Sequence, residues 1–349
     1  MVWKDIKISA HNKFNYKIIS LSHGDGGTKT SELINNLILK YLGNEVLNKL
    51  EDSAVLNLDA KKLAFTTDSF VVKPIFFPGG DIGKLSICGT VNDLVTSGCR
   101  PIAISFAIII EEGFPVADLK KILISINKTL KEINLNIVTG DTKVVEKGNA
   151  DKIYINTSGI GIIHDNTPLS PSRIKVGDKI LINGSIGDHG ISILSQRKEF
   201  NFKTDLISDC APLSNLVREM LASSDKIHAL RDPTRGGLAT ILIEMAKTSK
   251  TNMVIYQNKI PVKKETYGIC EFLGLDPLYI ANEGKIVAFV DRNDAVKVLS
   301  AMKKNKYGEN SQIIGEVTEK GEGFIILNTD LGTNRILDKY YSEQLPRIC

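Results

Sequence analysis

The chain alternates short apolar runs with helical periods twice, and this repeated alternation limits the folds it can adopt. In the first half, strands are predicted at 63–73, 102–110, 136–139 and 153–163, and helices at 28–42, 81–97 and 115–134. In the second half, strands are predicted at 179–183, 254–256, 285–290, 313–317 and 323–327, and helices at 188–196, 213–221, 236–248, 263–273 and 294–303. This order of elements predicts an α+β (mixed α/β) fold built from layers rather than a doubly wound sheet.

A proline- and glycine-bearing stretch at 164–178 separates the two halves and is the best candidate for a linker. We therefore expect a first domain at 21–165 and a second at 166–328. Residues 1–20 are expected to form a polar N-terminal extension. Residues 329–349 show little periodicity and are expected to form a flexible tail.

Composition and charge exclude several classes of function. Hydrophobic residues make up 42% and charged residues 24% of the chain, a balance typical of soluble globular proteins. The net charge is only +4 and the lysines are scattered, so no nucleic-acid surface is indicated. Residues 1–13 do not resemble a signal peptide, and the strongest apolar run, 102–110, is too short to span a bilayer. We expect a cytoplasmic protein that binds neither nucleic acid nor membrane.

The five cysteines are widely spaced, odd in number and form no Cys-x-x-Cys pair. This pattern argues against a disulfide framework and against a zinc site, and it fits a reducing cytoplasm. Four of them lie in helical or apolar contexts and are expected to be packing residues: Cys88, Cys99, Cys210 and Cys270. The fifth, Cys349, is the last residue of the sequence.

The segment 345–349, Leu-Pro-Arg-Ile-Cys, is the most distinctive feature of the sequence. Proline stiffens the approach to the thiol, and arginine offers one charged contact to a partner surface or a phosphate. A tail that starts near residue 328 would reach up to roughly 70 Å if fully extended, so Cys349 could enter an active site. The adjacent α-carboxylate disfavours the thiolate, so the thiol would rely on its catalyst for activation. The alternative is an exposed cysteine without a function.

Neither standard nucleotide fingerprint is present. The stretch 24–30, Gly-Asp-Gly-Gly-Thr-Lys-Thr, is similar in composition to a P-loop but lacks the glycine five positions before a Gly-Lys-Ser/Thr group. No Gly-x-Gly-x-x-Gly follows a predicted strand. His23 and His189 lie in glycine-rich turns, but their spacing is not that of metal ligands.

A set of acidic residues near glycines offers another way to bind a nucleotide. Magnesium prefers oxygen ligands and shares them with substrate phosphates, and glycines let backbone N–H groups approach a phosphate closely. Each Asp–Gly pair alone is more often just a turn. Asp68 stands out because it interrupts an apolar strand, where an unpaired carboxylate is costly. The acidic residues are Asp25, Asp68, Asp93, Asp141, Asp188, Asp232 and Glu283, and the candidate phosphate-binding neighbours are Gly26, Gly27, Thr142, Lys143, Thr234 and Arg235.

Eight stretches, in order from about residue 22 to the end, resemble the HypE family of hydrogenase maturation proteins. They are Phe65-Thr-Thr-Asp-Ser-Phe-Val-Val, Phe77-Pro-Gly-Gly-Asp-Ile-Gly-Lys-Leu, Glu111-Glu-Gly-Phe-Pro, Val138-Thr-Gly-Asp-Thr-Lys-Val-Val, Gly187-Asp-His-Gly, Arg231-Asp-Pro-Thr-Arg-Gly-Gly, Ala281-Asn-Glu-Gly-Lys and Pro346-Arg-Ile-Cys. Several belong to the wider aminoimidazole ribonucleotide synthetase superfamily, and the last discriminates the family. The extension at 1–19 is longer than the family usually carries.

The resemblance implies a two-domain aminoimidazole ribonucleotide synthetase-like fold in a homodimer. The N-terminal ATP-binding and dimerisation domains of the two copies would pair into a barrel. It also implies an ATP-dependent enzyme that dehydrates a carbamoyl group on Cys349 to a thiocyanate. A HypF-type carbamoyltransferase would load the thiol, and a HypC–HypD complex would receive the cyano group for a nickel–iron hydrogenase.

By the same resemblance, Lys143 would stabilise charge near the transferred phosphoryl group and Glu283 would act as the base. Asp68, Asp93, Asp141 and Asp232 would organise Mg²⁺ and the ATP phosphates. Two alternatives stay open at this point. One is another ATP-using member of the superfamily, such as a selenophosphate synthetase, although the loop 23–27 lacks the cysteine usual there. The other is a non-catalytic carrier that presents Cys349 to partners.

Overall fold

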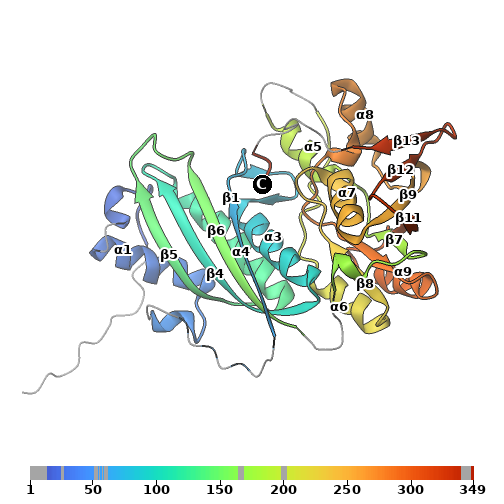
Figure 1. The fold of residues 1–349 in the computed structure, drawn as a ribbon. Helices are drawn as coiled ribbons and strands as arrows, with labels where there is room; N and C mark the ends of the chain where they lie inside the picture. The colour runs from blue at the N-terminus through green and yellow to red at the C-terminus, as the bar shows by residue number, and fades with distance from the viewer. Residues whose placement is uncertain are drawn as a thin grey trace, which may run out of the picture.

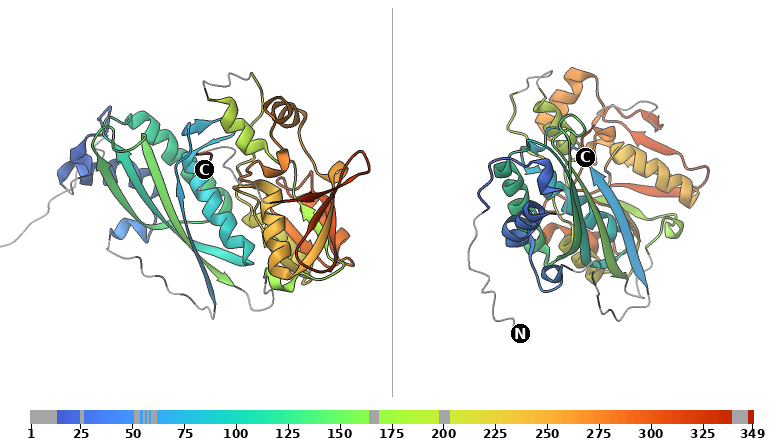
Figure 2. Two further views of the ribbon diagram at one scale, coloured as in Figure 1. Left: turned by 45° about the horizontal axis from the view of Figure 1, so that its top comes forward. Right: turned by 90° about the vertical axis from the view of Figure 1, so that its left-hand side faces the viewer.

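A computed structural model of the chain describes residues 14–24, 27–50, 54, 56, 58, 62–163, 169–197, 203–338 and 347–349. These residues form two α/β halves that lie side by side (Figures 1 and 2). In both figures the C-terminal end of the chain lies between the two halves. Within the described residues, no helix combines the length and the apolar character needed to cross a membrane.

The first half has two layers, a sheet of strand order β1-β6-β4-β5 and helices against one of its faces (Figure 1). In β4, alternate side chains from Ile104 to Ile110 are buried on the helix side, as the period of a strand requires. On the other face, which no described helix covers, Phe65 is 70% exposed and Ile109 is 43% exposed. The elements are α1 (Thr28–Leu33), a π-turn (Ile34–Ile38), α2 (Leu39–Leu42), β1 (Leu63–Phe70), β2 (Phe76–Phe77), β3 (Gly80–Asp81), α3 (Ile82–Thr96), β4 (Cys99–Glu111), α4 (Val116–Ile133), β5 (Ile137–Val145) and β6 (Ile153–Ile163).

The second half has a seven-stranded sheet of order β13-β12-β9-β11-β7-β10-β8 between two layers of helices. Neighbouring residues of one strand enter different cores: Phe289 packs on the α7 side, and Ala288 and Val290 pack on the α6 and α9 side. Both faces are therefore buried around β10, whose four residues are all apolar and buried. The elements are β7 (Lys179–Ile182), α5 (Asp188–Ser195), α6 (Ser214–Ser223), β8 (Ile227–Arg231), α7 (Gly237–Ser249), β9 (Thr251–Tyr256), α8 (Lys264–Leu273), β10 (Val287–Val290), α9 (Ala295–Lys304), β11 (Gln312–Lys320), β12 (Ile325–Asn328) and β13 (Asn334–Leu337).

Helix α3 joins the two halves. Asp81 caps its start by accepting hydrogen bonds from the N–H groups of Gly83 and Lys84. Two glycines allow close contacts: a Cβ on Gly83 would lie 2.8 Å from Ile122, and one on Gly89 would lie 2.9 Å from the Phe70 ring. The helix is thereby wedged between α4 and β1.

The polar link from α3 to the second half is the buried side chain of Asn92. Its Nδ2 donates to the carbonyl oxygens of Ala211 (3.0 Å) and Glu283 (3.2 Å), and its Oδ1 accepts from the N–H of Leu213 (2.9 Å). One amide side chain therefore satisfies three backbone groups of the other half.

Most predicted helices and strands are present, and five features differ from the prediction. The hairpin β2–β3 and strands β8 and β13 were not predicted, and β13 lies inside the expected tail. Asp141–Lys143 were expected in a turn but lie inside β5. Within the expected polar extension, Ile19 is fully buried, and its backbone pairs with Phe114 and Gly113 at 2.8 and 2.7 Å. The predicted linker falls partly on 164–168, outside the described residues.

We expect Asn92→Ala to destabilise the protein by about 2–3 kcal/mol, because the N–H of Leu213 and the carbonyl of Ala211 would lose this partner, and the carbonyl of Glu283 would keep only the longer bond from the N–H of Ala211 (3.4 Å). Urea unfolding measures the change. Asn149→Ala is the matched control, since Asn149 is exposed and bonds only locally to Glu146. Equal unfolding free energies for the two variants would contradict a structural role for Asn92.

Candidate active site

Four of the predicted acidic residues converge where α3, β1 and the second half meet. Asp68 lies in β1 on the face that contacts α3, since its Oδ2 is 3.6 Å from the position a Cβ on Gly89 would take. Asp93 lies on α3 and accepts a hydrogen bond from Thr66 Oγ1 (3.1 Å). From the second half, Asp232 follows β8 directly and Glu283 precedes β10. Asp68 thus lies in a strand and Asp93 in a helix, as the predicted strand at 63–73 and the predicted helix at 81–97 imply.

Burial raises the pKa of each carboxylate in this acidic cluster, and the charge of Asp93 raises those of Asp232 and Asp68 further. Burial, followed by the charge of Asp93, raises the pKa of Asp232 to about 7. Burial, followed by Asp93, also raises the pKa of Asp68, and Arg235 partly offsets this. Burial raises the pKa of Asp93 too, while Thr66 and Arg231 lower it. Converging carboxylates that resist ionisation suit a position where a cation is to be bound.

Glu283 is the most strongly perturbed carboxyl of the cluster. Its side chain is buried, and burial together with the charges of neighbouring acidic groups raises its pKa well above the ordinary value. Its backbone is held on both sides: its N–H donates to Asp209 Oδ1 (3.1 Å) and its carbonyl accepts from Asn92 (3.2 Å). A raised pKa means a higher affinity for a proton, so a carboxylate in this fixed position is suited to proton transfer.

Asp209 and Lys285 form a buried ion pair (3.1 Å) beside Glu283 that sequence analysis did not single out. The side chains are only 3% and 10% exposed. A Cβ on Gly284 would lie 1.8 Å from the Asp209 carbonyl oxygen, so glycine is required between Glu283 and Lys285. Lys285 lies two residues after Glu283 in the sequence but pairs with Asp209. No local pattern around Asp209 signals this, because the two residues are far apart in sequence.

The C-terminal residues dock at the same junction. Arg347 donates to Asp151 (Nη1–Oδ2, 2.7 Å) and to the carbonyl of Val71 (Nε–O, 3.0 Å). Its own carbonyl accepts from the N–H of Lys73 (3.1 Å) and from Arg197 (3.3 Å). The segment therefore runs beside the chain that continues from β1.

The next two residues enter the protein. Ile348 is 6% exposed, and its carbonyl is 2.6 Å from His189 Nε2. The carbonyl of Cys349 accepts from the N–H of Val71 (3.2 Å), and its side chain packs against a core cluster to which both halves contribute. The expectation of a flexible tail therefore does not hold for residues 347–349, nor for β13. His189, considered only as a weak metal candidate, contacts this segment instead.

Two predicted residues lie away from the cluster, on the uncovered face of the first sheet. Asp141 and Lys143 in β5 pair with Ala107 and Ile109 of β4, and they form an exposed ion pair with each other (2.9 Å). β5 and β1 are the two edges of this sheet, so two strands separate Asp141 from Asp68. Within one chain, the sheet stands between these residues and the acidic cluster.

The remaining predicted residues have separate environments. Thr142 points to the helix side of β5 and lines a cavity of about 280 Å³ under α1 and α2. Gly27 is the N-cap residue of α1, whereas Gly26 and Asp25 lie outside the described residues. Thr234 and Arg235 lie in the loop between β8 and α7. Asp188 has a structural role, because it bonds Thr266 (2.7 Å) and pairs with Lys263 (2.8 Å).

Within the described ranges, no group of three or more His, Cys, Asp or Glu side chains is arranged to hold a metal ion. A cage made by these residues alone is therefore not present. Mg²⁺ usually takes only one or two protein carboxylates and completes its shell with water and substrate phosphates. The oxygen donors of Asp68, Asp93 and Asp232 fit that mode of binding.

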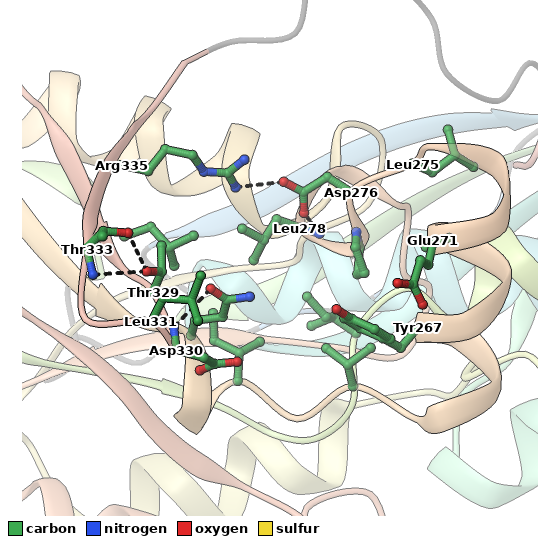
Figure 3. Close-up of a pocket in the computed structure, with 17 residues that line it drawn as sticks. Tyr267, Glu271, Leu275, Asp276, Leu278, Thr329, Asp330, Leu331, Thr333 and Arg335 are labelled. Atoms are coloured by element: carbon green, nitrogen blue, oxygen red, sulfur yellow. Dashed lines mark hydrogen bonds and ion pairs between the residues drawn. The ribbon is translucent and has the colours of Figure 1, made fainter.

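A larger cavity of about 660 Å³ lies elsewhere, between α8 and the loop that joins β12 to β13 (Figure 3). Its wall is mainly apolar, and Arg335 and Asp276 pair across its rim at 2.7 Å. None of the residues described above as site residues lines it.

Comparisons with known proteins agree on one family. Two family models match, the N-terminal domain of AIR synthase related proteins at 50–163 and the C-terminal domain at 175–328. The carbamoyl dehydratase HypE of Bradyrhizobium diazoefficiens is 44% identical over 95% of this chain and 96% of its own length. That of Cupriavidus necator is 43% identical over 99% of both.

Solved structures give the same result. A structure of the hydrogenase maturation protein HypE in complex with ATP matches with a TM-score of 0.91 and 44% identity, over 95% of this chain and 99% of that one. HypE in a structure of the HypE–HypF complex matches with a TM-score of 0.77 and 47% identity, over 90% of this chain and all of that one. A thiamine-monophosphate kinase from Stenotrophomonas maltophilia, at 18% identity and a TM-score of 0.64 over 82% of this chain and 90% of that one, shares the fold alone.

The raised pKa of Asp232 predicts a pH-dependent effect on stability. The pKa of Asp232 is about 7 in the folded protein and has the ordinary Asp value of 3.8 in the unfolded chain. The free energy of unfolding therefore decreases as pH rises from the lower to the higher of these values. Asp232→Asn should therefore stabilise the protein at pH 8, by at most about 4 kcal/mol, and leave it nearly unchanged at pH 4. Urea unfolding at both pH values tests this, with exposed Asp225→Asn as the control.

Proposed function

The chain belongs to the HypE family of carbamoyl dehydratases, and on that premise we propose that it uses ATP to dehydrate a carbamoyl group on its own Cys349 to a cyano group. The observation that supports this most is the docking of residues 347–349 at the junction that also holds the acidic cluster. Val71, whose N–H binds Cys349, comes shortly after Asp68 in the sequence. Asp209 accepts a hydrogen bond from the N–H of Glu283 and directly follows Ser208, which binds His189. The product would supply a cyanide ligand for nickel–iron hydrogenase maturation.

The reaction needs an oxygen to leave and two protons to be removed. The amide oxygen of the thiocarboxamide would take the γ-phosphoryl group of ATP, giving ADP. The C–O bond would then break, releasing inorganic phosphate, while the nitrogen loses its two protons in turn and the C≡N bond forms. Glu283 would accept these protons one at a time and pass them to solvent, a role suited to its raised pKa.

The residues around Glu283 would bind and orient the nucleotide. Asp68, Asp93 and Asp232 would hold Mg²⁺, which would neutralise phosphate charge during transfer. Thr234 and Arg235 would contact phosphate oxygens beside Asp232. Thr142 and Gly27 lie apart from Glu283 within one chain, and with Gly26 they would contact phosphate from the partner copy of a homodimer. Asn92 would keep Glu283 aligned, because it binds the carbonyl of that residue.

Lys143 and Asp141 would join the site through a homodimer. The uncovered sheet face carries exposed apolar side chains, and its edges are β1 and β5. Closing two such sheets into one barrel places β5 of one copy beside β1 of the other. Lys143 would then lie at the seam beside β1 of the partner copy, from where its charge would act on the phosphoryl group transferred at that copy's site.

The docked position of Cys349 also bears on the proposed partners. A HypF-type carbamoyltransferase would have to reach the thiol, so residues 347–349 would leave this position to be loaded and return for dehydration. A HypC–HypD complex would receive the cyano group afterwards.

Glu283→Gln tests the proposed base. The variant keeps shape and hydrogen-bonding capacity but cannot take up a proton, so carbamoyl-loaded protein should still bind ATP and accumulate thiocarboxamide. We expect the single-turnover rate of dehydration to decrease by at least about 100-fold. Mass spectrometry of the C-terminal peptide measures this rate. Glu271→Gln, at an exposed position away from the site, is the control. Thiocyanate formed at the wild-type rate would remove Glu283 from the mechanism.

A mixing experiment tests the shared site. Lys143→Ala and Glu283→Gln should each be inactive alone. After unfolding and refolding together, mixed dimers should regain one intact site, which gives about a quarter of wild-type activity. Differential tagging at the N-terminus demonstrates that mixed dimers have formed. If these dimers regain no activity, Lys143 and Glu283 act in the site of their own chain.

A further inference from the structure

His189 joins three separate parts of the structure although it is fully buried. Its Nδ1 is 2.8 Å from Ser208 Oγ, and its Nε2 is 2.6 Å from the Ile348 carbonyl oxygen. Its ring also packs edge-on against the ring of Phe77, with the two ring planes nearly perpendicular and the centroids 5.6 Å apart. Both ring nitrogens are therefore engaged, which leaves neither for a metal ion.

The partners fix the tautomer of the ring. A carbonyl oxygen only accepts, so Nε2 must carry the proton that points to Ile348. Nδ1 then accepts from the Ser208 hydroxyl, whose oxygen in turn accepts from the N–H of Cys210 (3.1 Å). Burial lowers the pKa of His189, so the neutral ring is retained at pH 7.

The hydrogen bond to Ile348 acts directly on the reacting residue. The carbonyl of Ile348 and the Cα of Cys349 share one planar peptide unit, so holding the first fixes the position of the second. On the other side of that Cα, the carbonyl of Cys349 is held by the N–H of Val71 at 3.2 Å. Two hydrogen bonds thus flank the Cα of Cys349 and set the direction of its side chain.

We propose that His189 is a positioning residue of this reaction, which holds Cys349 in the orientation for dehydration by donating from Nε2 to the Ile348 carbonyl. This inference rests on the proposed function for its catalytic consequence, but the docking itself is measurable without ATP or a partner. Ser208 supports the role by fixing the tautomer. Asp151 acts at a separate point, through the side chain of Arg347.

Two substitutions at the same position separate positioning from packing. Glutamine places an amide N–H near the location of Nε2 and keeps the bond to Ile348. Asparagine reaches only as far as Nδ1, so it keeps Ser208 and loses Ile348. Ser208→Ala is a third, milder variant, because the ring is then free to adopt the other tautomer, which turns a lone pair toward the carbonyl.

Alkylation of the thiol measures docking in the unmodified full-length protein. The other four cysteines are buried, so native iodoacetamide labelling reports on Cys349, with mass spectrometry to confirm the site. His189→Asn should raise the labelling rate by roughly two- to tenfold, the change in population that one hydrogen bond supports. His189→Gln should stay near wild type, and Ser208→Ala should fall between them. Thermal midpoints identify any variant that fails to fold.

The tautomer and the reaction supply two further readouts. Nitrogen-15 shifts of His189 should report a protonated Nε2 in the wild type and a mixture in Ser208→Ala. In carbamoyl-loaded protein, His189→Asn should slow single-turnover dehydration with an unchanged ATP concentration dependence, and His189→Gln should restore the rate. Folded His189→Asn and Ser208→Ala with wild-type labelling rates would overturn the positioning role. Altered labelling in a protein that shows no ATP-dependent dehydration would instead refute the proposed function alone.

Discussion

A single buried amide, the side chain of Asn92, is the interaction on which the rest of the junction depends. Through it, α3 of the first half binds Ala211, Leu213 and Glu283 of the second. Asp93, one residue further along α3, lies beside Asp232 of the second half and contributes to the acidic cluster. An apolar residue at position 92 could fill the space but would remove a hydrogen bond from each of three buried backbone groups, so the alignment of the halves favours a polar side chain there.

Sequence periodicity predicted those helices and strands in which buried and exposed residues alternate regularly along the whole element. Strand β6 alternates buried and half-buried positions throughout, and its predicted bounds are those observed. Strand β8 escaped prediction because its His228 reads as polar, whereas in the structure a 2.8 Å contact with Asp178 allows it to be buried. Strand β13 escaped because three of its four residues are exposed, and it is held by pairing with β12 rather than by a core.

Sequence analysis could predict only those site residues that are unusual in their local sequence. Asp68 was singled out because a carboxylate in an apolar strand requires a reason, and the structure gives one. Asp209 and Lys285 could not be found in this way, because a buried ion pair between distant residues leaves no local pattern. The separation of Asp141 from the cluster was equally hidden, since the face of a sheet on which a residue lies depends on the register of β5 with β4.

The docking of residues 347–349 changes what substrate affinity means for such an enzyme. A reacting group carried on the same chain as its binding position has an effective concentration set by the connecting segment, not by the amount of protein. The docked fraction would take the place that KM has for a diffusible substrate. Strengthening the contacts of Arg347, Ile348 and Cys349 beyond a certain point would then give no faster turnover, because each cycle also requires those residues to leave.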